Sequence, residues 1–574
     1  MNNSDVSNLF DELGDLLEFQ GANPFRVRAY RNAARTLKDL GEPLTAIVAD
    51  PARKLTDIQG IGDDLADKIV AILTTGKLPQ LEELRVQTPA SVMALLRIPG
   101  LGPKKAAVLF KELGIQTLDQ LREACQDHRV QALKGFGKKT EETILAGLPL
   151  ASQAEVRLYW ADADVVAQSI LAHLRSCPSV EQLEIAGSYR RGRETVGDLD
   201  VLAVSSNPAE VMDRFAALEG HQATLARGET RMAIRMARGL QVDLRVVPAE
   251  SFGAALQYFT GSKAHNVVLR GMAKDRGLKI NEYGVYRGEE RIAGATEADV
   301  YAALELPCFP PELREARQEF AWAAAGQLPK LLEMSDLQGD LHMHTTDTDG
   351  RATLEEMCLT ARERGLHYIA ITDHSKRVTM ARGLDGARLF KQWDEIDRLN
   401  AKLDGFRVLK GVEVDILERG GLDLPDEVLV RADWVVASVH YGQNQPREQI
   451  TERIVGALEN PYVSAIAHPT GRLINRRKPY EVDLEAVFLA ARRCGKLMEL
   501  NANPARLDLD DVACAAARRH GIPIVISTDA HSTEQLGVMR YGVIQARRAG
   551  LTKADVANTR SWPALKKLIG QKPR

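Results

Sequence analysis

Apolar residues recur at helical spacing through the first 150 residues, so we expect this part of the chain to be helical. One pattern occurs there three times: an apolar residue, any residue, glycine, an apolar residue and glycine precede a polar helical run. The copies are IQGIGDDLADKI (58–69), IPGLGPKKAAVL (98–109) and LKGFGKKTEETI (133–144). One copy would indicate an ordinary turn between helices, but three copies at intervals of 40 and 35 residues are hard to explain that way.

Two glycines at this spacing permit a tight turn that exposes backbone N–H groups at the start of the second helix. Such a turn binds phosphate without needing net positive charge. The three copies resemble helix-hairpin-helix motifs, which bind DNA backbones without sequence specificity. The residues expected to meet DNA are Gly60, Gly62, Gly100, Gly102, Lys104, Gly135, Gly137 and Lys138.

The pattern changes after residue 155. Residues 155–250 alternate helical and strand patterns, as in an α+β region, and the prolines of LPCFPPELRE (306–315) mark a boundary. A helical stretch over 316–334 should bridge to the last part of the chain. From residue 336 onward, short strands alternate with helices, which indicates a parallel α/β barrel or sheet.

Length and composition narrow the class of protein. A chain of 574 residues should hold three or four domains. Because the net charge is −3, any DNA-binding surface must be confined to part of the chain. The six cysteines have no CxxC spacing, which suits a reducing cytoplasm. The N-terminal sequence lacks the features of a secretory signal, and no apolar run approaches membrane-spanning length. We therefore expect a cytoplasmic protein without a membrane partner.

Three carboxylates lie on apolar segments that read as strands. Asp198 and Asp200 share one face of DLDVLAV, and Asp243 lies in LQVDLRVV. Carboxylate oxygens of this kind suit two divalent cations. The alternative is that Asp198 and Asp200 pair with nearby arginines, but the apolar residues that flank them disfavour it. Gly187 and Ser188 offer donors to phosphate, and Arg191 adds a charged clamp. This set indicates two-metal phosphoryl or nucleotidyl transfer.

Two segments resemble the signatures of family X DNA polymerases, the group of DNA polymerase beta: GSYRRGRETVGDLDVL (187–202) and YFTGSKAHNVVLR (258–270). The resemblance implies that Asp198 and Asp200 bind both metals and that Asp243 joins the metal that activates the primer 3′-hydroxyl. The implied nucleotide-binding residues are Gly187, Ser188 and Arg191 at the triphosphate, Tyr258 and Phe259 at the sugar, and Asn266 and Arg270 at the nascent base pair and template. Core packing is the alternative for the two aromatic residues.

Lys68 falls where the N-terminal domain of polymerase beta carries its Schiff-base lysine. That chemistry needs an amine with a depressed pKa, and the neighbouring Asp63, Asp64 and Asp67 favour the protonated form instead. The alternative is a surface lysine that pairs with Asp64. We expect weak or absent 5′-deoxyribose-phosphate lyase activity.

Eight of the twelve histidines follow residue 336. Six of them and three acids lie in short motifs, and nearly all follow short apolar runs, as expected at the C-terminal ends of barrel strands. These candidate ligands are His342, His344, Asp349, His374, Glu413, His440, His468, Asp529 and His531. Mixed imidazole and carboxylate ligands favour zinc, manganese or iron over magnesium.

These motifs resemble the PHP (polymerase and histidinol phosphatase) domain, a trinuclear metallophosphoesterase on a distorted barrel. The resemblance implies one metal at His342, His344, Glu413 and Asp529, a second at Glu413, His440 and His468, and a third at Asp349, His374 and His531. HPTGRLINRR and NANPARLDL resemble the subtype fused to bacterial family X polymerases. Arg472 and Arg506 are candidates to bind the substrate phosphate. The alternative for each is a surface salt bridge.

We therefore predict a multidomain chain: a helical helix-hairpin-helix N-terminal region, an α+β family X (nucleotidyltransferase-like) polymerase core, and a C-terminal distorted α/β (PHP) barrel. The predicted domains are 1–90, N-terminal helical DNA-binding and lyase-like; 91–150, second and third helix-hairpin-helix motifs; 151–250, catalytic palm; 251–318, thumb-like nucleotide and template subdomain; 319–336, linker; and 337–574, PHP metallophosphoesterase.

The function that this resemblance implies is a DNA repair polymerase that fills short gaps and carries a 3′–5′ exonuclease or 3′-end processing activity, with AP-endonuclease activity in addition. Expected partners are gapped or nicked double-stranded DNA and dNTPs, with Mg2+ or Mn2+ at the polymerase site and up to three Mn2+, Zn2+ or Fe2+ ions at the PHP site. We expect a monomer. The alternative is a metal-dependent DNA nuclease or phosphatase whose family X region serves mainly as a DNA-binding module.

Overall fold

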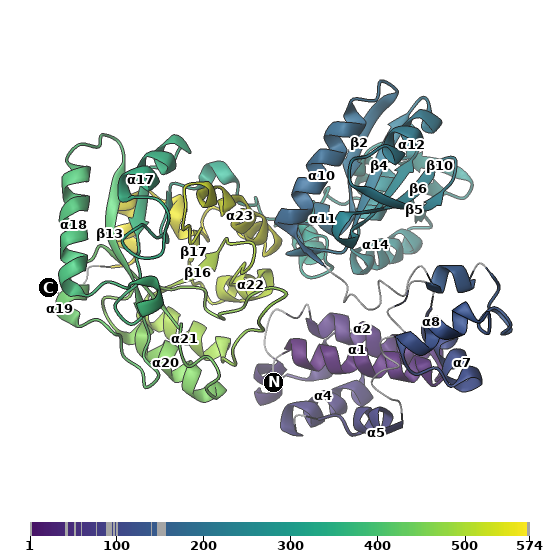
Figure 1. Ribbon diagram of the computed structural model, residues 1–574, viewed down its shortest axis with the longest axis horizontal. Coiled ribbons are helices and arrows are strands. Elements are labelled where there is room, and N and C mark those ends of the chain that lie inside the picture. The colour runs from purple at the N-terminus through teal and green to yellow at the C-terminus, as the bar shows by residue number, and fades with distance from the viewer. Residues whose placement is uncertain are drawn as a thin grey trace. The chain divides into compact units, whose positions relative to one another are not determined.

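The computed structural model describes most of the chain (Figure 1). The described residues are 3–38, 40, 44–50, 53–58, 60–75, 77–87, 95, 98, 101–138, 140–145 and 157–570. They form two compact units, Met1–Val156 and Arg157–Arg574. Within the described part of the chain, each helix is too short or too polar to cross a membrane.

The first unit is helical, as predicted. Its helices are α1 (Asn3–Phe19), α2 (Pro24–Lys38), α3 (Leu44–Ala49), α4 (Asp63–Thr75), α5 (Pro79–Gln87), α7 (Pro103–Leu113) and α8 (Leu118–Gln126). Apolar faces of α1 to α5 enclose one core, and a second core lies among α7, α8 and residues up to Leu145. Phe19, at the end of α1, packs in the second core and joins the two halves.

The three repeated segments fold into the same turn. In each, the N–H of the apolar residue between the glycines donates to the carbonyl of the apolar residue three positions earlier. The pairs are Ile61–Ile58, Leu101–Ile98 and Phe136–Leu133, each at 3.0 Å. The carbonyls of Gly62, Gly102 and Gly137 then accept the first helical hydrogen bonds. The sequence repeat is therefore a repeat of backbone conformation as well. Gly100 lies outside the described residues.

The second unit begins with an α+β region, again as predicted. Its five-stranded sheet has the order β2-β4-β7-β6-β5, in which β4 and β7 are parallel neighbours and the other pairs are antiparallel. The strands are β2 (Val180–Ile185), β4 (Asp198–Ser205), β5 (His221–Arg227), β6 (Arg231–Met236) and β7 (Gln241–Val246). Helices α10 (Trp160–Arg175) and α12 (Pro208–Ala216) share a core with this sheet. The short pair β1 (Leu158–Tyr159) and β3 (Thr195–Val196) flanks it.

Residues 252–309 form a smaller subdomain around its own hydrophobic core. It contains α13 (Phe252–Thr260), α14 (Lys263–Asp275), α15 (Glu297–Ala302) and an antiparallel sheet of β8 (Lys279–Asn281), β9 (Gly284–Arg287) and β10 (Glu290–Ala293). Tyr301 and Phe309 are buried in its core with Leu269.

The predicted helix over 316–334 is wrong in length. The α-helix there is short, α16 (Glu319–Ala324), and Met334 begins a 3-10 turn. Gly326 adopts a left-handed φ of 64°, which ends the helix, and Pro329 lacks the N–H that a continued helix needs. The alanine-rich composition of this stretch favours a helix but does not set its end.

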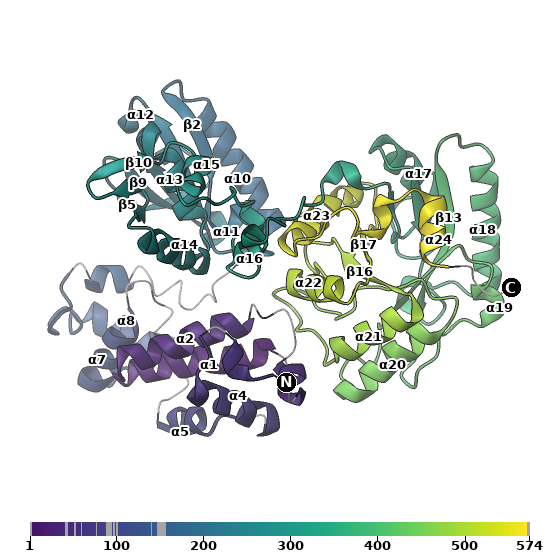
Figure 2. The same ribbon diagram turned by 180° about the vertical axis from the view of Figure 1, so that it is seen from behind.

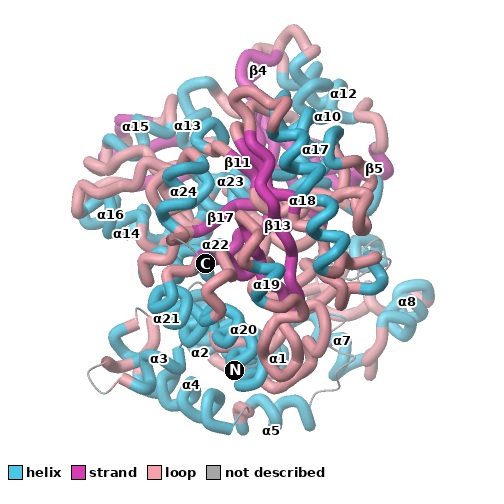
Figure 3. Tube along the Cα trace, turned by 90° about the vertical axis from the view of Figure 1, so that its left-hand side faces the viewer, coloured by secondary structure: helices cyan, strands magenta, loops and turns pink. Residues whose placement is uncertain are grey.

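The rest of the second unit is a nearly closed parallel barrel (Figure 3), which confirms the predicted fold class. Its strands neighbour one another in chain order: β11 (Gly339–Asp340), β12 (Tyr368–Ile371), β13 (Arg407–Asp415), β14 (Trp434–Ser438), β15 (Ala465–Ile466), β16 (Leu497–Asn501) and β17 (Ile524–Ser527). A parallel bridge between Met343 and Ala530 joins the residues that follow the first and last strands.

Side chains alternate between the inside of the barrel and its outer layer. On β12, Tyr368 and Ala370 belong to the inner core, whereas Ile369 and Ile371 belong to the core beneath the helices. The helices of this region are α17 (Leu354–Glu363), α18 (Gly386–Asn400), α19 (Asp426–Leu429), α20 (Arg447–Glu459), α21 (Leu484–Cys494), α22 (Asp511–Arg519), α23 (Met539–Arg548) and α24 (Trp562–Leu568).

Candidate polymerase site and metal centre

The register of the five-stranded sheet brings the three predicted carboxylates together. Asp200 on β4 and Asp243 on β7 are direct partners across the parallel pair, and Asp198 begins β4 on the same side as Asp200. Burial and the charges of Asp198 and Asp243 raise the pKa of Asp200 to about 7. Such repulsion is what a divalent cation would relieve.

Helix α11 (Gly187–Arg190) begins directly above Asp200. Gly187 has a φ of 67°, and a Cβ atom on it would stand 2.7 Å from Oδ2 of Asp200. The N–H of Ala186 donates to the Asp200 carbonyl at 2.7 Å. Glycine is therefore required here, and the first residue of α11 lies next to the Asp200 carboxylate, as a phosphate site beside metal ligands requires.

Arg191, predicted to contact the triphosphate, is held inward. Its Nε donates to Glu315 at 3.1 Å, and its Nη1 donates to the carbonyl of Thr260. Sequence reasoning missed Glu315, because a partner 124 positions away leaves no local signal.

The other predicted nucleotide-binding residues gather on α13 and α14. The rings of Tyr258 and Phe259 lie 5.0 Å apart, and the guanidinium of Arg270 lies 5.1 Å from the Tyr258 ring centroid. Asn266 donates to the Tyr258 carbonyl at 2.8 Å. One cluster thus contains all four, and Arg245 adds a second guanidinium 4.5 Å from the Phe259 ring.

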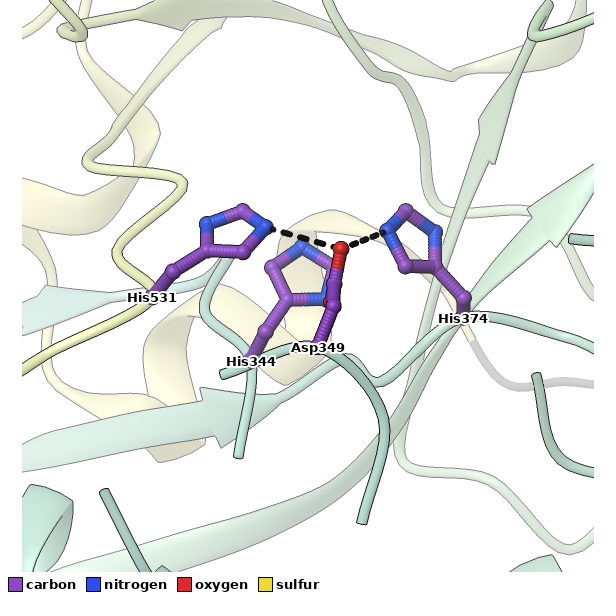
Figure 4. Close-up of side chains that lie close together, drawn as sticks. All are labelled: His344, Asp349, His374 and His531. Atoms are coloured by element: carbon purple, nitrogen blue, oxygen red, sulfur yellow. Dashed lines mark ion pairs between the residues drawn. The ribbon is translucent and has the colours of Figure 1, made fainter. Parts of the chain in front are cut away.

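The nine predicted barrel ligands form one cluster at the C-terminal ends of the strands. Glu413 on β13 lies at its centre, with its carboxylate 2.7 Å from His374 Nδ1, 3.1 Å from His468 Nε2 and 3.3 Å from His440 Nε2. His342 and His344 approach the same carboxylate at 3.6 and 3.7 Å. Figure 4 shows Asp349 between His374 and His531, with each imidazole 3.5 Å from its carboxylate.

The donor atoms fit divalent cations. Three sets have donor atoms within 4.8 Å of one another: His344, Asp349, His374 and His531; His342, His344 and Asp529; and His374, Glu413 and His440. The buried atoms Nε2 of His342, Nδ1 of His344 and Oε2 of Glu413 lack hydrogen-bond partners among the described residues, although buried polar atoms normally have one. Metal ions bound at these sets would supply the missing partners.

The carboxylates and imidazoles of the cluster shift one another's pKa values. Burial acts to raise the pKa of Glu413, but the imidazoles of His440, His374 and His342 hold it well below its usual range. Burial acts to lower the pKa of His374, yet the charges of Glu413 and Asp349 raise it to about 10. Carboxylates thus stay ionised here, as cation ligands must.

Comparison with known protein families finds the helix-hairpin-helix, polymerase and barrel regions in the order in which the structure has them. Four families match: Helix-hairpin-helix domain (residues 1–78), SAM-like Helix-hairpin-helix tandem (92–148), DNA polymerase beta thumb (255–315) and PHP domain (340–474). The chain is 41% identical to the DNA polymerase/3′-5′ exonuclease PolX of Bacillus subtilis over 98% of each chain. The chain belongs to the PolX family.

The barrel also has separate relatives. A probable phosphatase of Thermoanaerobacter is 32% identical over 38% of this chain and 89% of its own length. A probable phosphatase of Acetivibrio thermocellus is 35% identical over 34% of this chain and 81% of its own length. The same barrel therefore occurs without the polymerase region.

The structure of this PolX chain also reveals residues that support the ligands. Glu499 accepts a hydrogen bond from His342 Nδ1 at 2.7 Å and another from the backbone N–H of His468. Asp415 lies 3.1 Å from His440 Nδ1. Each carboxylate fixes an imidazole so that its Nε2 faces the cluster. GVEVDI and LMELN gave a weak signal, an acid near the end of an apolar strand.

The two candidate phosphate-binding arginines differ in surroundings. Arg472 is nearly buried and donates to Glu194 at 2.8 Å and to the carbonyls of Arg506 and Leu507. Arg506 lies 3.5 Å from the ligand Asp529. Arg506 is therefore the one of the two that borders the metal cluster, and Arg472 has a structural role.

Lys68 on α4 pairs with Asp64 four residues earlier. Burial acts to lower its pKa, but hydrogen bonds with Asp64 and Tyr30 outweigh burial and raise it. The amine is thus held in the protonated form, which is not nucleophilic.

Proposed function

We propose that this chain is a DNA repair polymerase that fills short gaps by two-metal nucleotidyl transfer, with a metal-dependent 3′–5′ exonuclease and 3′-end processing activity in its barrel. The observation that carries the proposal is the pairing of Asp200 with Asp243 beneath α11, in the same chain as a nine-residue ligand cluster.

In the polymerase site, Asp198, Asp200 and Asp243 would hold two divalent cations, which supply an activated primer 3′-hydroxyl and neutralise the triphosphate. The start of α11, with Gly187 and Ser188, offers N–H and hydroxyl donors to the phosphates. Tyr258, Phe259, Asn266 and Arg270 would meet the sugar, the nascent base pair and the template, since they gather on one pair of helices.

In the barrel, the nine ligands would hold up to three cations, which supply a water-derived nucleophile and polarise the phosphodiester. We assign His342, His344, Glu413 and Asp529 to one ion, Glu413, His440 and His468 to a second, and Asp349, His374 and His531 to a third. Arg506 would bind a substrate phosphate next to Asp529.

The ions and partners follow from the ligand chemistry. The carboxylate site should take Mg2+ or Mn2+, and the imidazole-rich site Mn2+, Zn2+ or Fe2+. The helix-hairpin-helix turns and the thumb region support DNA binding, and we propose gapped or nicked duplexes with dNTPs as substrates. AP-endonuclease activity, a monomeric state, a cytoplasmic location and the six predicted domain ranges stay predictions.

A second candidate function is that of a phosphatase or nuclease in which the polymerase region serves only to bind DNA. The two probable phosphatases that match the barrel favour it. The three carboxylates and the glycine turn above Asp200 disfavour it, because a binding module has no need of a repulsive acidic cluster.

One gapped duplex with a labelled primer tests the proposal. Asp198→Ala with Asp200→Ala should abolish nucleotide incorporation and leave 3′-end degradation, whereas His344→Ala should do the reverse. Loss of both activities in either folded variant would contradict two separate centres. Release of phosphate from small esters but no DNA degradation would favour the phosphatase.

A further inference from the structure

The loop that follows α11 packs directly on the barrel. A Cβ atom on Gly192 would stand 2.2 Å from Cγ2 of Ile544 on α23. Glu194 accepts a hydrogen bond from Arg472 at 2.8 Å. Figures 1 and 2 both show α23 at the edge of the barrel that lies nearest to α10 and α11. The segment that should contact the triphosphate is therefore seated on the nuclease domain.

Alternating charges run from this segment into the barrel. Nε of Arg191 donates to Oε1 of Glu315 at 3.1 Å, and Nη1 of Arg548 donates to the same oxygen at 3.0 Å. Nη2 of Arg548 donates to Asp511 at 2.8 Å, and Arg317 donates to the same carboxylate at 3.0 Å. Arg548 also donates to the backbone carbonyl of Arg191 at 2.6 Å.

These charges are shielded from water. The side chains of Arg548 and Glu315 are only 1% and 7% exposed. Removal of one member of a buried ionic set leaves an uncompensated charge, so its neighbours must rearrange. Arg191 depends on Arg548 in two ways. Arg548 shares the charge of Glu315, and it is the donor to the carbonyl that follows α11.

We propose that Arg548 is a positioning residue for nucleotide incorporation, which reaches the polymerase site from the barrel. By sharing Glu315, it leaves the Arg191 guanidinium able to turn toward the triphosphate, and by binding the Arg191 carbonyl it fixes the end of α11. The inference rests on the proposed polymerase function. Without Arg548, Glu315 would retain Arg191 more tightly, since the next guanidinium, that of Arg193, lies 3.9 Å away.

Single-nucleotide gap filling by the full chain tests this. Arg548→Ala should raise the KM for dNTP roughly tenfold, the effect of one lost charged hydrogen bond, and leave kcat within about twofold. Arg547→Ala is the matched control. Arg547 precedes Arg548 on α23 and pairs with Glu312 at 2.7 Å and with the Leu332 carbonyl at 3.0 Å. The Arg547→Ala variant should therefore have the same KM for dNTP as the unaltered chain.

Two further variants separate positioning from damage to the fold. Glu315→Gln in the Arg548→Ala background removes the charge that retains Arg191 and should restore part of the dNTP affinity. Arg548→Lys keeps the charge without the planar fork and should give an intermediate KM. All variants should degrade 3′ ends normally.

An unchanged KM in Arg548→Ala, or a fall in kcat alone, would overturn the inference. If Arg548→Ala does not fold, an unaltered KM in Arg548→Lys overturns it instead. Absence of incorporation by the unaltered chain would refute the proposed function rather than this role of Arg548.

Discussion

At the scale of single residues, Glu499 links two barrel ligands through its two carboxylate oxygens, one at His342 Nδ1 and one at the His468 N–H. Glu499→Ala should lower metal content and 3′-end degradation by about 10- to 100-fold, the usual effect of losing such a support. Metal retained after dialysis, measured by mass spectrometry, checks this beside the activity.

A matched control exists for this prediction. Glu485 forms a similar pair with His520, at 3.0 Å, away from the ligand cluster. Glu485→Ala should retain both metal and activity. If Glu499→Ala also retains its metal, the role assigned to Glu499 is wrong.

Lys68 gives a second prediction at this scale. Because Asp64 and Tyr30 raise the pKa of its amine, borohydride should trap little cross-linked product on a 5′-deoxyribose-phosphate duplex. Asp64→Ala removes the partner that holds the proton and should increase trapping. Efficient trapping by the unaltered chain that disappears in Lys68→Ala would refute the prediction.

The sequence was most informative about residues with a local signature. Asp198, Asp200 and the barrel histidines lie in short motifs next to apolar strands, so their type and spacing sufficed to predict that they lie together. Glu315 and Arg548 gave no such signal, because they contact Arg191 from 124 and 357 positions away and only the packed fold brings the three together. Glu499 was missed because its role depends on the neighbouring strands.

At the scale of elements, the helix-hairpin-helix turns offer a paired test. Gly135 has a φ of 87°, so Gly135→Ala should destabilise the turn by about 1–2 kcal/mol. Gly137 lacks a left-handed φ, and a Cβ atom on it would meet nothing within 4 Å. Gly137→Ala should therefore keep the melting temperature but weaken binding to gapped DNA several-fold, because the methyl group would stand between the turn and a phosphate.

Thermal unfolding and fluorescence anisotropy at low salt measure the two effects separately. Unaltered DNA affinity in Gly137→Ala would show that the third turn does not approach the phosphate backbone.

Element boundaries were harder to predict than element types. The five-stranded sheet and the N-terminal helices were expected from periodicity, the barrel was expected from the family resemblance, and all three are confirmed. The bridge over 316–334 was expected as one helix, but Gly326 and Pro329 end it early. Periodicity reports which face of a segment is apolar, whereas the end of a helix depends on one or two residues and on what they pack against.

At the scale of the whole molecule, one polypeptide carries two centres with different ligand chemistry. Three carboxylates form the first, and six imidazoles with three carboxylates form the second. Carboxylate oxygens bind Mg2+ and Mn2+ alike, but imidazole nitrogen binds the harder Mg2+ poorly. The supplied metal should therefore select between the activities.

We predict that protein stripped with a chelator and given Mg2+ extends a primer across a gap with little 3′-end degradation. Addition of Mn2+ should then switch on degradation without stopping synthesis, because only the barrel gains occupancy. In His344→Ala the degradation products should be absent in Mn2+ while extension persists, which assigns them to the barrel. Degradation in Mg2+ alone that equals degradation in Mn2+ would mean that carboxylates dominate the nuclease site, and the assignment of its histidines as ligands would have to change.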